Sequence, residues 1–387
     1  MLYKFILVNS KDMSHIGELG QAHDKKCDII FNKPGSAGFT YPMNADYASL
    51  IQPYKTGIKV MRFNKALSDA AKYSIWDTLW SGYVLPIDED VTNNKMTVSC
   101  VGWLQRLAKR FLRRDKQYVN VDDAVIVQNL IDEANLLLTP ETVPYAVPVV
   151  AGSSPNTPTW LSWGGTMPNE GPGGATAYVA APTPRSKTYT KYTYILSAIE
   201  EMMNIESGGD IVVDPLTRAV TWHRKYRRVK DDVVFGFEWG PKNVSAFGRN
   251  IEADSQVNYL VATGAPGTFP QFAENKAQMS EIGLIEETAA LSDIRDNNVL
   301  LAYAGGEILV RAPGKITYSV TPFSYNPSEY GGVPEPFVTF RVGDQVRLTA
   351  VHPPRVDIRG QAIRIFGMSL SISDSGVGTL SALQVAP

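Results

Sequence analysis

The 387-residue chain has only two cysteines, and its four histidines are isolated from one another. Two cysteines are too few for the disulfide framework of a small secreted scaffold, and they form no CxxC pair. We interpret Cys27 and Cys100 as buried apolar residues. The histidines lack the HxxxH spacing that puts two ligands on one helical face, so we expect no metal and no cofactor. They are His15, His23, His223 and His352.

An excess of charge of either sign is also missing, because 37 Lys and Arg residues oppose 39 Asp and Glu residues for a net charge of −2. This balance argues against a protein that binds nucleic acid by bulk charge. No apolar run approaches the roughly 18 residues of a membrane-spanning helix. The only unbroken apolar stretch near the start, residues 5–8, is too short for the core of a secretory signal. We therefore expect no membrane span and a chain that is soluble as synthesised.

The chain is instead rich in turn formers and aromatics, with 25 Pro, 31 Gly, 18 Tyr and 7 Trp. This composition is typical of strands joined by many turns. Over residues 1–118 it predicts short strands closed by a helix at 103–114, whose leucines and Phe111 share one face. Alternation over 76–84 and 96–101, on either side of a polar loop, predicts an antiparallel hairpin. The other predicted strands span 2–8, 27–31, 38–41 and 57–63.

Residues 119–250 are predicted to be a mixed domain. Asn120 is expected to cap a helix that carries Asp122 and Asp123 in its first turn. Residues 140–184 then hold 9 Pro and 6 Gly with little periodicity, which predicts a long irregular loop. A second amphipathic helix at 195–203 precedes a hairpin whose strands, 211–213 and 219–222, flank a turn at Asp214 and Pro215.

Strands return over residues 251–387. We predict one at 258–263 and then, after a helical, acidic stretch at 292–312, others at 315–320, 337–340, 345–348, 363–373 and 378–385. The predicted fold class is therefore mainly β with an α+β middle, in three domains: 1–118, 119–250 with the insertion 140–184, and 251–387.

One stretch of the sequence resembles the barrel signature of minor tail proteins that form the baseplate hub of siphophages, especially those of actinobacteria. It consists of Trp80-Ser-Gly-Tyr-Val84, a polar loop, residues 96–101 and then Gly102-Trp103-Leu104. Four later segments resemble that family in order and spacing: 192–215, the strand ending at Gly264, 342–348 and 360–372. The insertion 140–184 departs from its compact connection.

The resemblance implies two tube-like antiparallel β-barrel domains with a mixed domain inserted between them, and a homotrimeric ring of six barrels at the phage tail tip. Such a ring joins a sixfold tail tube to a threefold tip, because each protomer presents two similar docking surfaces. The implied partners are the tail tube or a distal tail protein, the tape-measure protein and other tail-tip or fibre proteins. DNA would pass through the channel without specific binding during genome ejection, and the virion protein would be made in the host cytoplasm.

Two groups of residues are candidates for partner contacts. Aromatics in the insertion could anchor neighbouring subunits or stack on cell-surface sugars, and packing over the protein's own surface is an equal alternative. Basic residues in the runs 106–116 and 224–230 could lie on an interprotomer or solvated face, or contact DNA or acidic loops. The candidates are Tyr145, Trp160, Trp163, Tyr178, Arg110, Arg113, Arg227 and Arg228.

We expect no catalytic residues. Asp210 and Asp214 near Glu206 could be imagined as an acid pair for glycoside cleavage, but a turn role for Asp214 before Pro215 is favoured. Gly314-Lys315 lacks the upstream glycine of a phosphate loop, because position 309 is Leu. The function predicted is a structural hub, and the alternatives are a receptor- or carbohydrate-binding tail-tip protein and a cell-wall hydrolase.

Overall fold

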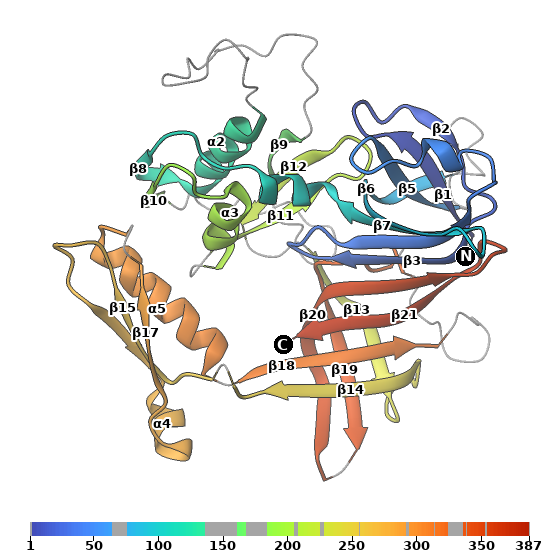
Figure 1. Ribbon diagram of the computed structural model, residues 1–387. Coiled ribbons are helices and arrows are strands. Elements are labelled where there is room, and N and C mark those ends of the chain that lie inside the picture. The colour runs from blue at the N-terminus through green and yellow to red at the C-terminus, as the bar shows by residue number, and fades with distance from the viewer. Residues whose placement is uncertain are drawn as a thin grey trace.

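The fold is mainly β, which confirms the predicted class. In the computed structural model one 13-stranded sheet links the two ends of the chain, and the helices lie in a middle segment and in a smaller unit (Figure 1). The described residues are 2–63, 76–135, 161–167, 184–204, 208–224, 228–254, 256–291, 294–312, 314–323, 336–337, 339–352 and 354–386.

The N-terminal module consists of seven antiparallel strands in the order β2-β1-β5-β6-β7-β4-β3. The predicted hairpin is confirmed, since β6 pairs with β7 and places Val84 opposite Cys100. Apolar residues alternate into one core that holds Phe5, Phe39 and Val98. The strands are β1 (Tyr3–Asn9), β2 (His15–Glu18), β3 (His23–Ile30), β4 (Ser36–Pro42), β5 (Thr56–Phe63), β6 (Trp76–Asp90) and β7 (Lys95–Gly102), with a short 3-10 turn, η1 (Ala48–Leu50).

The C-terminal module has six strands in the order β14-β18-β21-β20-β19-β13. The predicted strand at 337–340 is wrong, because only an isolated bridge joins Pro336 to Phe340 there. Two of its strands, β13 and β14, were not predicted. A charged run at 230–232 interrupts β13, and β14 is almost entirely exposed and so lacks a regular apolar face. The elements are β13 (Arg228–Phe237), β14 (Val244–Glu252), β18 (Lys315–Pro322), β19 (Asp344–His352), β20 (Val356–Ile372) and β21 (Gly378–Ala386).

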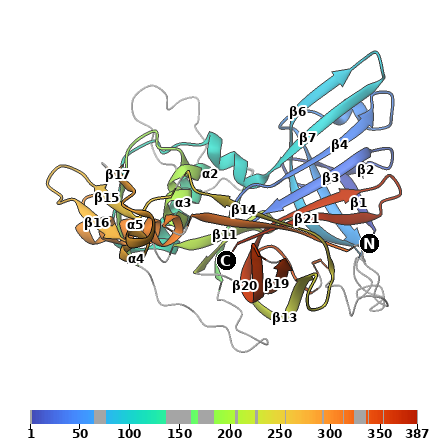
Figure 2. The same cartoon turned by 90° about the horizontal axis from the view of Figure 1, so that it is seen from below.

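Strand β20 belongs to both modules. One edge of it pairs first with β19, over residues 356–364, and then with β3, over residues 367–372. Its other edge pairs with β21. Leu370 and Ile372 of β20 lie in the core of the N-terminal module, and Phe31 lies in the core of the C-terminal one. The two β modules therefore share core residues. Their strands form one continuous sheet (Figure 2).

The middle segment packs two helices against short strands. The predicted helix at 103–114 is wrong in type and extent, because a 3-10 helix, η2 (Trp103–Lys109), ends where the backbone extends at Arg110. Asn120 lies in a strand, and Asp122 instead accepts from the Ala124 N–H at 3.0 Å. The other elements are β8 (Lys116–Asp122), α2 (Asp123–Asn135), β9 (Ser162–Met167), β10 (Pro184–Tyr189), α3 (Ile195–Asn204), β11 (Gly209–Val213) and β12 (Ala219–Arg224).

Part of the predicted loop 140–184 is ordered structure. Strand β9 lies inside it and pairs in parallel with β12, while Leu161 is buried in the core of the middle segment. The Leu161 carbonyl accepts a hydrogen bond from Asn135 Nδ2 at 2.6 Å. The expected helix at 195–203 and the hairpin of β11 with β12 are both confirmed.

A smaller unit with its own core interrupts the C-terminal module. One face of its three-stranded sheet packs Leu260 and Ala262 against Leu300 and Ala304 of a helix. That helix was predicted from 292 but begins at Asn297, where Asp296 caps it. The predicted domain boundaries stay predictions. The unit contains β15 (Tyr259–Thr263), β16 (Gln271–Glu274), α4 (Lys276–Ile282), β17 (Glu286–Ala290) and α5 (Asn297–Arg311).

Both cysteines are buried apolar residues, as predicted, and face the core of the N-terminal module. Burial raises the pKa of the Cys27 thiol and of the Cys100 thiol, which disfavours the reactive thiolate. We expect neither thiol of the folded chain to react with Ellman's reagent at pH 8, and both to react in guanidinium chloride. Rapid labelling of the native chain would contradict this arrangement.

The shared strand makes a second prediction. Replacing Leu370, which is 2% exposed, with Ala removes a side chain of β20 from the N-terminal module's core. We expect a loss of about 2–5 kcal/mol in unfolding free energy, measured by urea denaturation. The matched control is Ser371→Ala on the same strand, whose side chain is exposed. It should change stability by no more than about 0.5 kcal/mol, and an equal loss in both variants would show that Leu370 does not pack there.

Candidate functional site

The two β modules and the middle segment meet at one carboxylate, Asp210. Asn32, in the turn between β3 and β4, donates from Nδ2 to Asp210 Oδ1 at 2.8 Å. The Ile211 N–H donates to Asn32 Oδ1 at 2.9 Å, so the turn and the strand bind each other reciprocally. Arg364 of β20 donates from Nη2 to Asp210 Oδ2 at 2.5 Å. A single side chain of β11 therefore joins all three parts.

The surroundings of this junction favour a fixed geometry. The side chain of Asp210 is 8% exposed and that of Arg364 is 30% exposed, so the ion pair is only partly open to water. The Arg364 guanidinium also lies 4.4 Å from the centre of the Phe31 ring. Asn32 has a φ of 60°, a left-handed conformation that Asn tolerates better than most residues. A partly buried, charge-assisted contact of this kind specifies one arrangement of the parts.

The turn of the β11–β12 hairpin is fixed to the N-terminal module by Arg218. Its guanidinium donates to the carbonyls of Ser10 at 3.1 Å and Lys11 at 3.2 Å. Burial lowers the pKa of Arg218, an effect that Asp12 opposes. The guanidinium also lies 5.2 Å from the Trp103 ring, so the arginine is held by two carbonyls and an aromatic face.

A second contact links the same hairpin to β6. The Trp103 Nε1–H donates to Ser81 Oγ at 2.9 Å, and Ser81 in turn donates to the Pro215 carbonyl at 2.5 Å. Gly102 precedes Trp103 where a Cβ would lie 1.8 Å from the Pro34 carbonyl oxygen, so only glycine fits. The Gly102-Trp103 pair of the sequence signature is thus explained by close packing.

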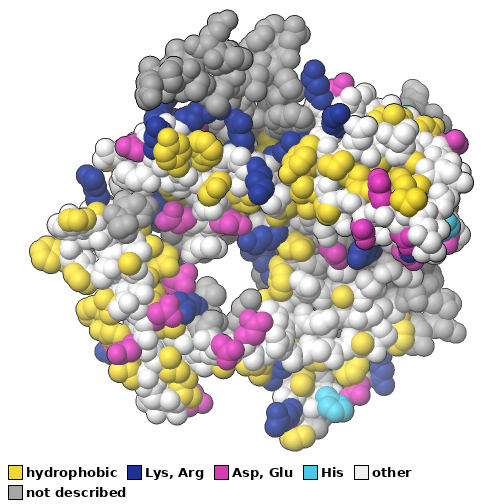
Figure 3. All heavy atoms as spheres, in the orientation of Figure 1, with side chains coloured by type: hydrophobic (Ala, Val, Ile, Leu, Met, Phe, Trp, Pro, Cys, Tyr) yellow, Lys and Arg dark blue, Asp and Glu magenta, His cyan; other side chains and the backbone are white. Residues whose placement is uncertain are grey.

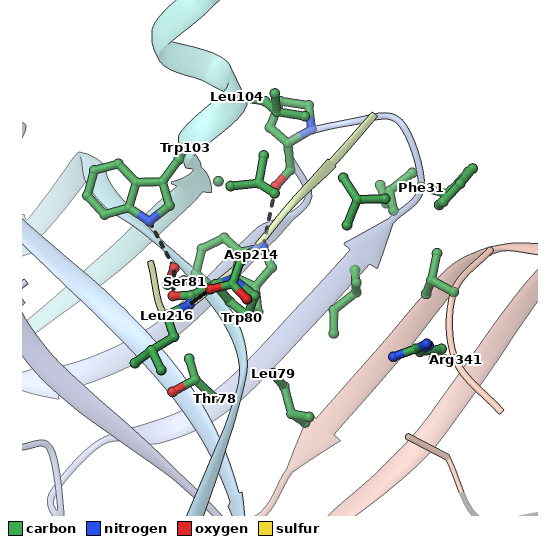
Figure 4. Close-up of a pocket in the computed structure, with 18 of the residues that line it drawn as sticks. Phe31, Thr78, Leu79, Trp80, Ser81, Trp103, Leu104, Asp214, Leu216 and Arg341 are labelled. Carbon is green, nitrogen blue, oxygen red and sulfur yellow. Dashed lines mark hydrogen bonds between the residues drawn. The ribbon is translucent and has the colours of Figure 1, made fainter. Parts of the chain in front are cut away.

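A cleft of about 650 Å³ lies between these parts (Figure 4). Trp80 and Leu79 of β6 line one side, the turn at Asp214 and Leu216 covers part of it, and Arg341 lies on the side of the C-terminal module. Its walls are mostly apolar and aromatic. Such a surface is suited to an apolar segment rather than to acid–base chemistry.

The predicted turn role of Asp214 is confirmed. Its Oδ1 accepts from the Leu216 N–H at 2.9 Å, the Thr217 N–H at 2.6 Å and the Thr217 hydroxyl at 2.9 Å. Asp210 is engaged by Arg364, and Glu206 lies outside the described residues. Over the described part of the chain, no three His, Cys, Asp or Glu side chains are placed to hold a metal ion.

The predicted basic residues that the structure describes lie in two different parts of the molecule. Arg110 and Arg113 lie in the middle segment, where burial lowers the pKa of Arg110 and the nearby charge of Arg113 lowers it further. Arg228 lies in β13 and binds Asp344, which is fully buried, at 3.0 Å and 2.5 Å. The role of these three arginines toward partners stays a prediction.

Most of the aromatic candidates lie outside the residues that the structure describes. Trp163 lies in β9, where its backbone pairs with Val220. Tyr145, Trp160, Tyr178 and Arg227 lie outside the described residues. Among the helices that are described, none has the length and apolar character to cross a bilayer.

Asn32 and Arg364 were not predicted to be members of the junction. Asn32 lies in a turn, Arg364 lies in a predicted strand, and neither has a sequence signal that indicates its partner. Their partner Asp210 is 178 and 154 residues away from them, respectively. Only the three-dimensional fold brings these side chains together.

The junction predicts a stability effect. Asp210→Ala removes the acceptor of both Asn32 and Arg364, and we expect the unfolding free energy to fall by about 2–3 kcal/mol in a urea titration. This is below the ~3–5 kcal/mol of a fully buried pair, because Arg364 keeps some exposure. The control is Asp357→Ala, which removes a pair with Arg359 at the surface, where side chains are 60% and 68% exposed. It should cost less than about 1 kcal/mol. Equal effects would refute a special role for Asp210.

Comparison with solved structures finds the same architecture in phage tail proteins. A tail protein from Neisseria meningitidis MC58 matches with a TM-score of 0.62 at 9% identity, over 100% of this chain and 97% of that one. The 43 kDa tail protein of prophage MuSo2 from Shewanella oneidensis matches with a TM-score of 0.56 at 12% identity, over 99% and 98%. Prophage tail protein gp18 from Listeria monocytogenes EGD-e matches with a TM-score of 0.54 at 10% identity, over 99% and 94%.

No family model matches the sequence. No curated protein matches it either. The similarity is therefore one of structure, at identities too low to carry residue roles across. The chain has the fold of these phage tail proteins along essentially its whole length.

Proposed function

We propose that this chain is a structural subunit of a phage tail, in which it forms the baseplate or tail-tip hub. Three copies would make a ring in which each contributes two barrel-like β modules. The ring would connect the tail tube, or a distal tail protein, to the fibres and other proteins of the tip. The whole-length similarity in fold to three phage tail proteins supports a place in the tail.

The observation that carries the hub proposal is the continuous sheet. Because β20 pairs with both β19 and β3, the two β modules of one chain have a fixed relative position. Asp210 and its partners fix the middle segment to both of them. A rigid pair of β modules can occupy two neighbouring positions of a sixfold tube, and three such pairs complete the circle.

The ring would surround a channel for the tape-measure protein and then for DNA. A net charge of −2 over 387 residues suits a wall along which DNA slides without specific binding. The protein would have no membrane span of its own and would join the virion after synthesis in the host cytoplasm.

We propose a structural, non-enzymatic role, with no catalytic, metal or cofactor site. The acid pair that could be imagined for a cell-wall hydrolase lacks support in the structure, since Asp214 forms a turn and Asp210 binds Arg364. Receptor or carbohydrate binding through the aromatic insertion is the alternative function. Its candidate residues lie outside the described part of the chain or have no described side chain.

The proposal predicts the symmetry of the assembled tail tip. A map of intact tails by electron cryomicroscopy should show three copies of this chain around the axis, with six β modules facing the tube. A low-resolution map is enough to count copies. A single copy, or six copies with one module each against the tube, would overturn the hub proposal.

A further inference from the structure

The hairpin of β6 and β7 ends in an acidic tip with an apolar side chain at its end. Asp88, Glu89 and Asp90 are all exposed, and Val91, which follows them, is 75% exposed. We call residues 88–94 the acidic tip. A single exposed valine is common on a protein surface, and the distinctive feature here is the run of three carboxylates, of which Asp90 lies opposite Lys95 in the strand pairing.

Hydrogen bonds within the acidic tip, and from it to residues 43 and 44, fix its conformation. Asp90 accepts from the Asn93 N–H at 3.1 Å and from Asn93 Nδ2 at 2.6 Å. Asn94 donates to the Asn44 side chain at 2.7 Å, and the Asn94 carbonyl accepts from the Met43 N–H at 3.2 Å. A pre-organised tip of this kind loses little conformational entropy when it docks.

The C-terminal module carries a surface of the opposite character. A groove of about 490 Å³ lies between β14 and the hairpin of β19 and β20. Phe237 and Phe247 stack there with their ring centres 5.9 Å apart, and Ile251 is 53% exposed. We call this the basic groove. Its lining residues are Phe237, Glu238, Phe247, Arg249, Ile251, His352, Arg355 and Val356.

Two arginines, Arg249 and Arg355, line the basic groove and outnumber its one carboxylate, Glu238. Arg249 donates to the Arg355 carbonyl at 3.3 Å, which places the two residues next to each other. Within the described residues no carboxylate pairs with either guanidinium, whereas Glu238 is paired with His352 at 3.0 Å. Basic, histidine, acidic and apolar side chains lie together at the lower end of β19 and β20 in Figure 3.

The two surfaces are complementary but belong to different parts of the molecule. The β6–β7 hairpin projects from the N-terminal module, and the β19–β20 hairpin projects from the other end (Figures 1 and 2). The acidic tip of a chain therefore does not fill its own basic groove. A head-to-tail contact between copies would match carboxylates to arginines and Val91 to the apolar floor.

We propose that the acidic tip of one copy docks in the basic groove of the next copy and so forms the contact between protomers. This proposal rests on the ring described above and names the surfaces that would close it. Heterologous contacts of this kind generate rings when the rotation between copies closes. Opposite charges at the two surfaces would set the orientation and exclude tip-to-tip contacts.

Disulfide trapping tests the contact directly. The full chain with Val91→Cys and Ile251→Cys should form disulfide-linked oligomers, either as the isolated protein or in assembled tails, and reductant should reverse them. The native cysteines are buried and should not interfere. The matched control pairs Val91→Cys with Val377→Cys, another exposed valine that lies outside the groove, and should give no oligomers.

Charge exchange gives an independent readout. Asp88→Lys with Glu89→Lys, or Arg249→Glu with Arg355→Glu, should each lower the yield of linked oligomers about tenfold or more. Combining all four substitutions should restore it. These positions are exposed, and circular dichroism and the urea midpoint of each variant will verify that it folds.

The outcomes separate this inference from the hub proposal. If the tail tip is threefold but no oligomers are trapped, the hub proposal stands and the docking of the acidic tip in the basic groove is overturned. Trapped oligomers restored by charge exchange, in a tip without threefold symmetry, would support the docking and overturn the hub. Failure of the four-site variant to recover, with folding intact, would mean that the groove binds something other than the acidic tip.

Discussion

The hydrogen bonds between β20 and β3 are the constraint on which the rest of the structure depends. They connect residues near position 28 to residues near position 369, so the pairing requires nearly the whole chain to be in place. Once they form, Leu370 and Ile372 complete the N-terminal core. The two β modules then fold as one sheet rather than as two independent domains. Because β3 and β20 pair with each other, neither leaves an open edge at the junction that could mispair.

The polar junction adds what a sheet alone does not provide. Strand pairing sets the distance between the β modules but leaves the middle segment free to pack in several ways. Asp210 binds groups from both β modules, and Arg218 anchors the adjacent turn to a loop of the N-terminal one. Because these partners are directional and partly desolvated, alternative packings would leave charges without partners, which is costly.

Much of the local structure could be predicted from the sequence, because it depends on neighbours along the chain. The alternation of apolar and polar residues predicted the β6–β7 hairpin, and the turn-forming residues Asp214 and Pro215 predicted the β11–β12 hairpin. Strand β13 was missed because the charged run at 230–232 hides its apolar half. The helix expected at 103–114 failed because its apolar stripe packs as a 3-10 turn and then as extended chain. Asn32, Asp210 and Arg364 could not be grouped at all, since nothing local indicates which distant side chain each one meets.

Net charge, like the rest of the composition, does not reveal which side chains lie together in the fold. A sum of −2 is compatible with a passive channel wall, yet it is also what remains when an acidic tip and a basic groove on one chain cancel. Screening at physiological salt acts over about 8 Å, so separate charged surfaces are felt by a partner as local charges and not as their sum. A rigid protomer with opposite charges at its two ends is polar in the way that directional assembly requires. Near neutrality of the whole chain is therefore compatible with the local recognition between copies that we propose.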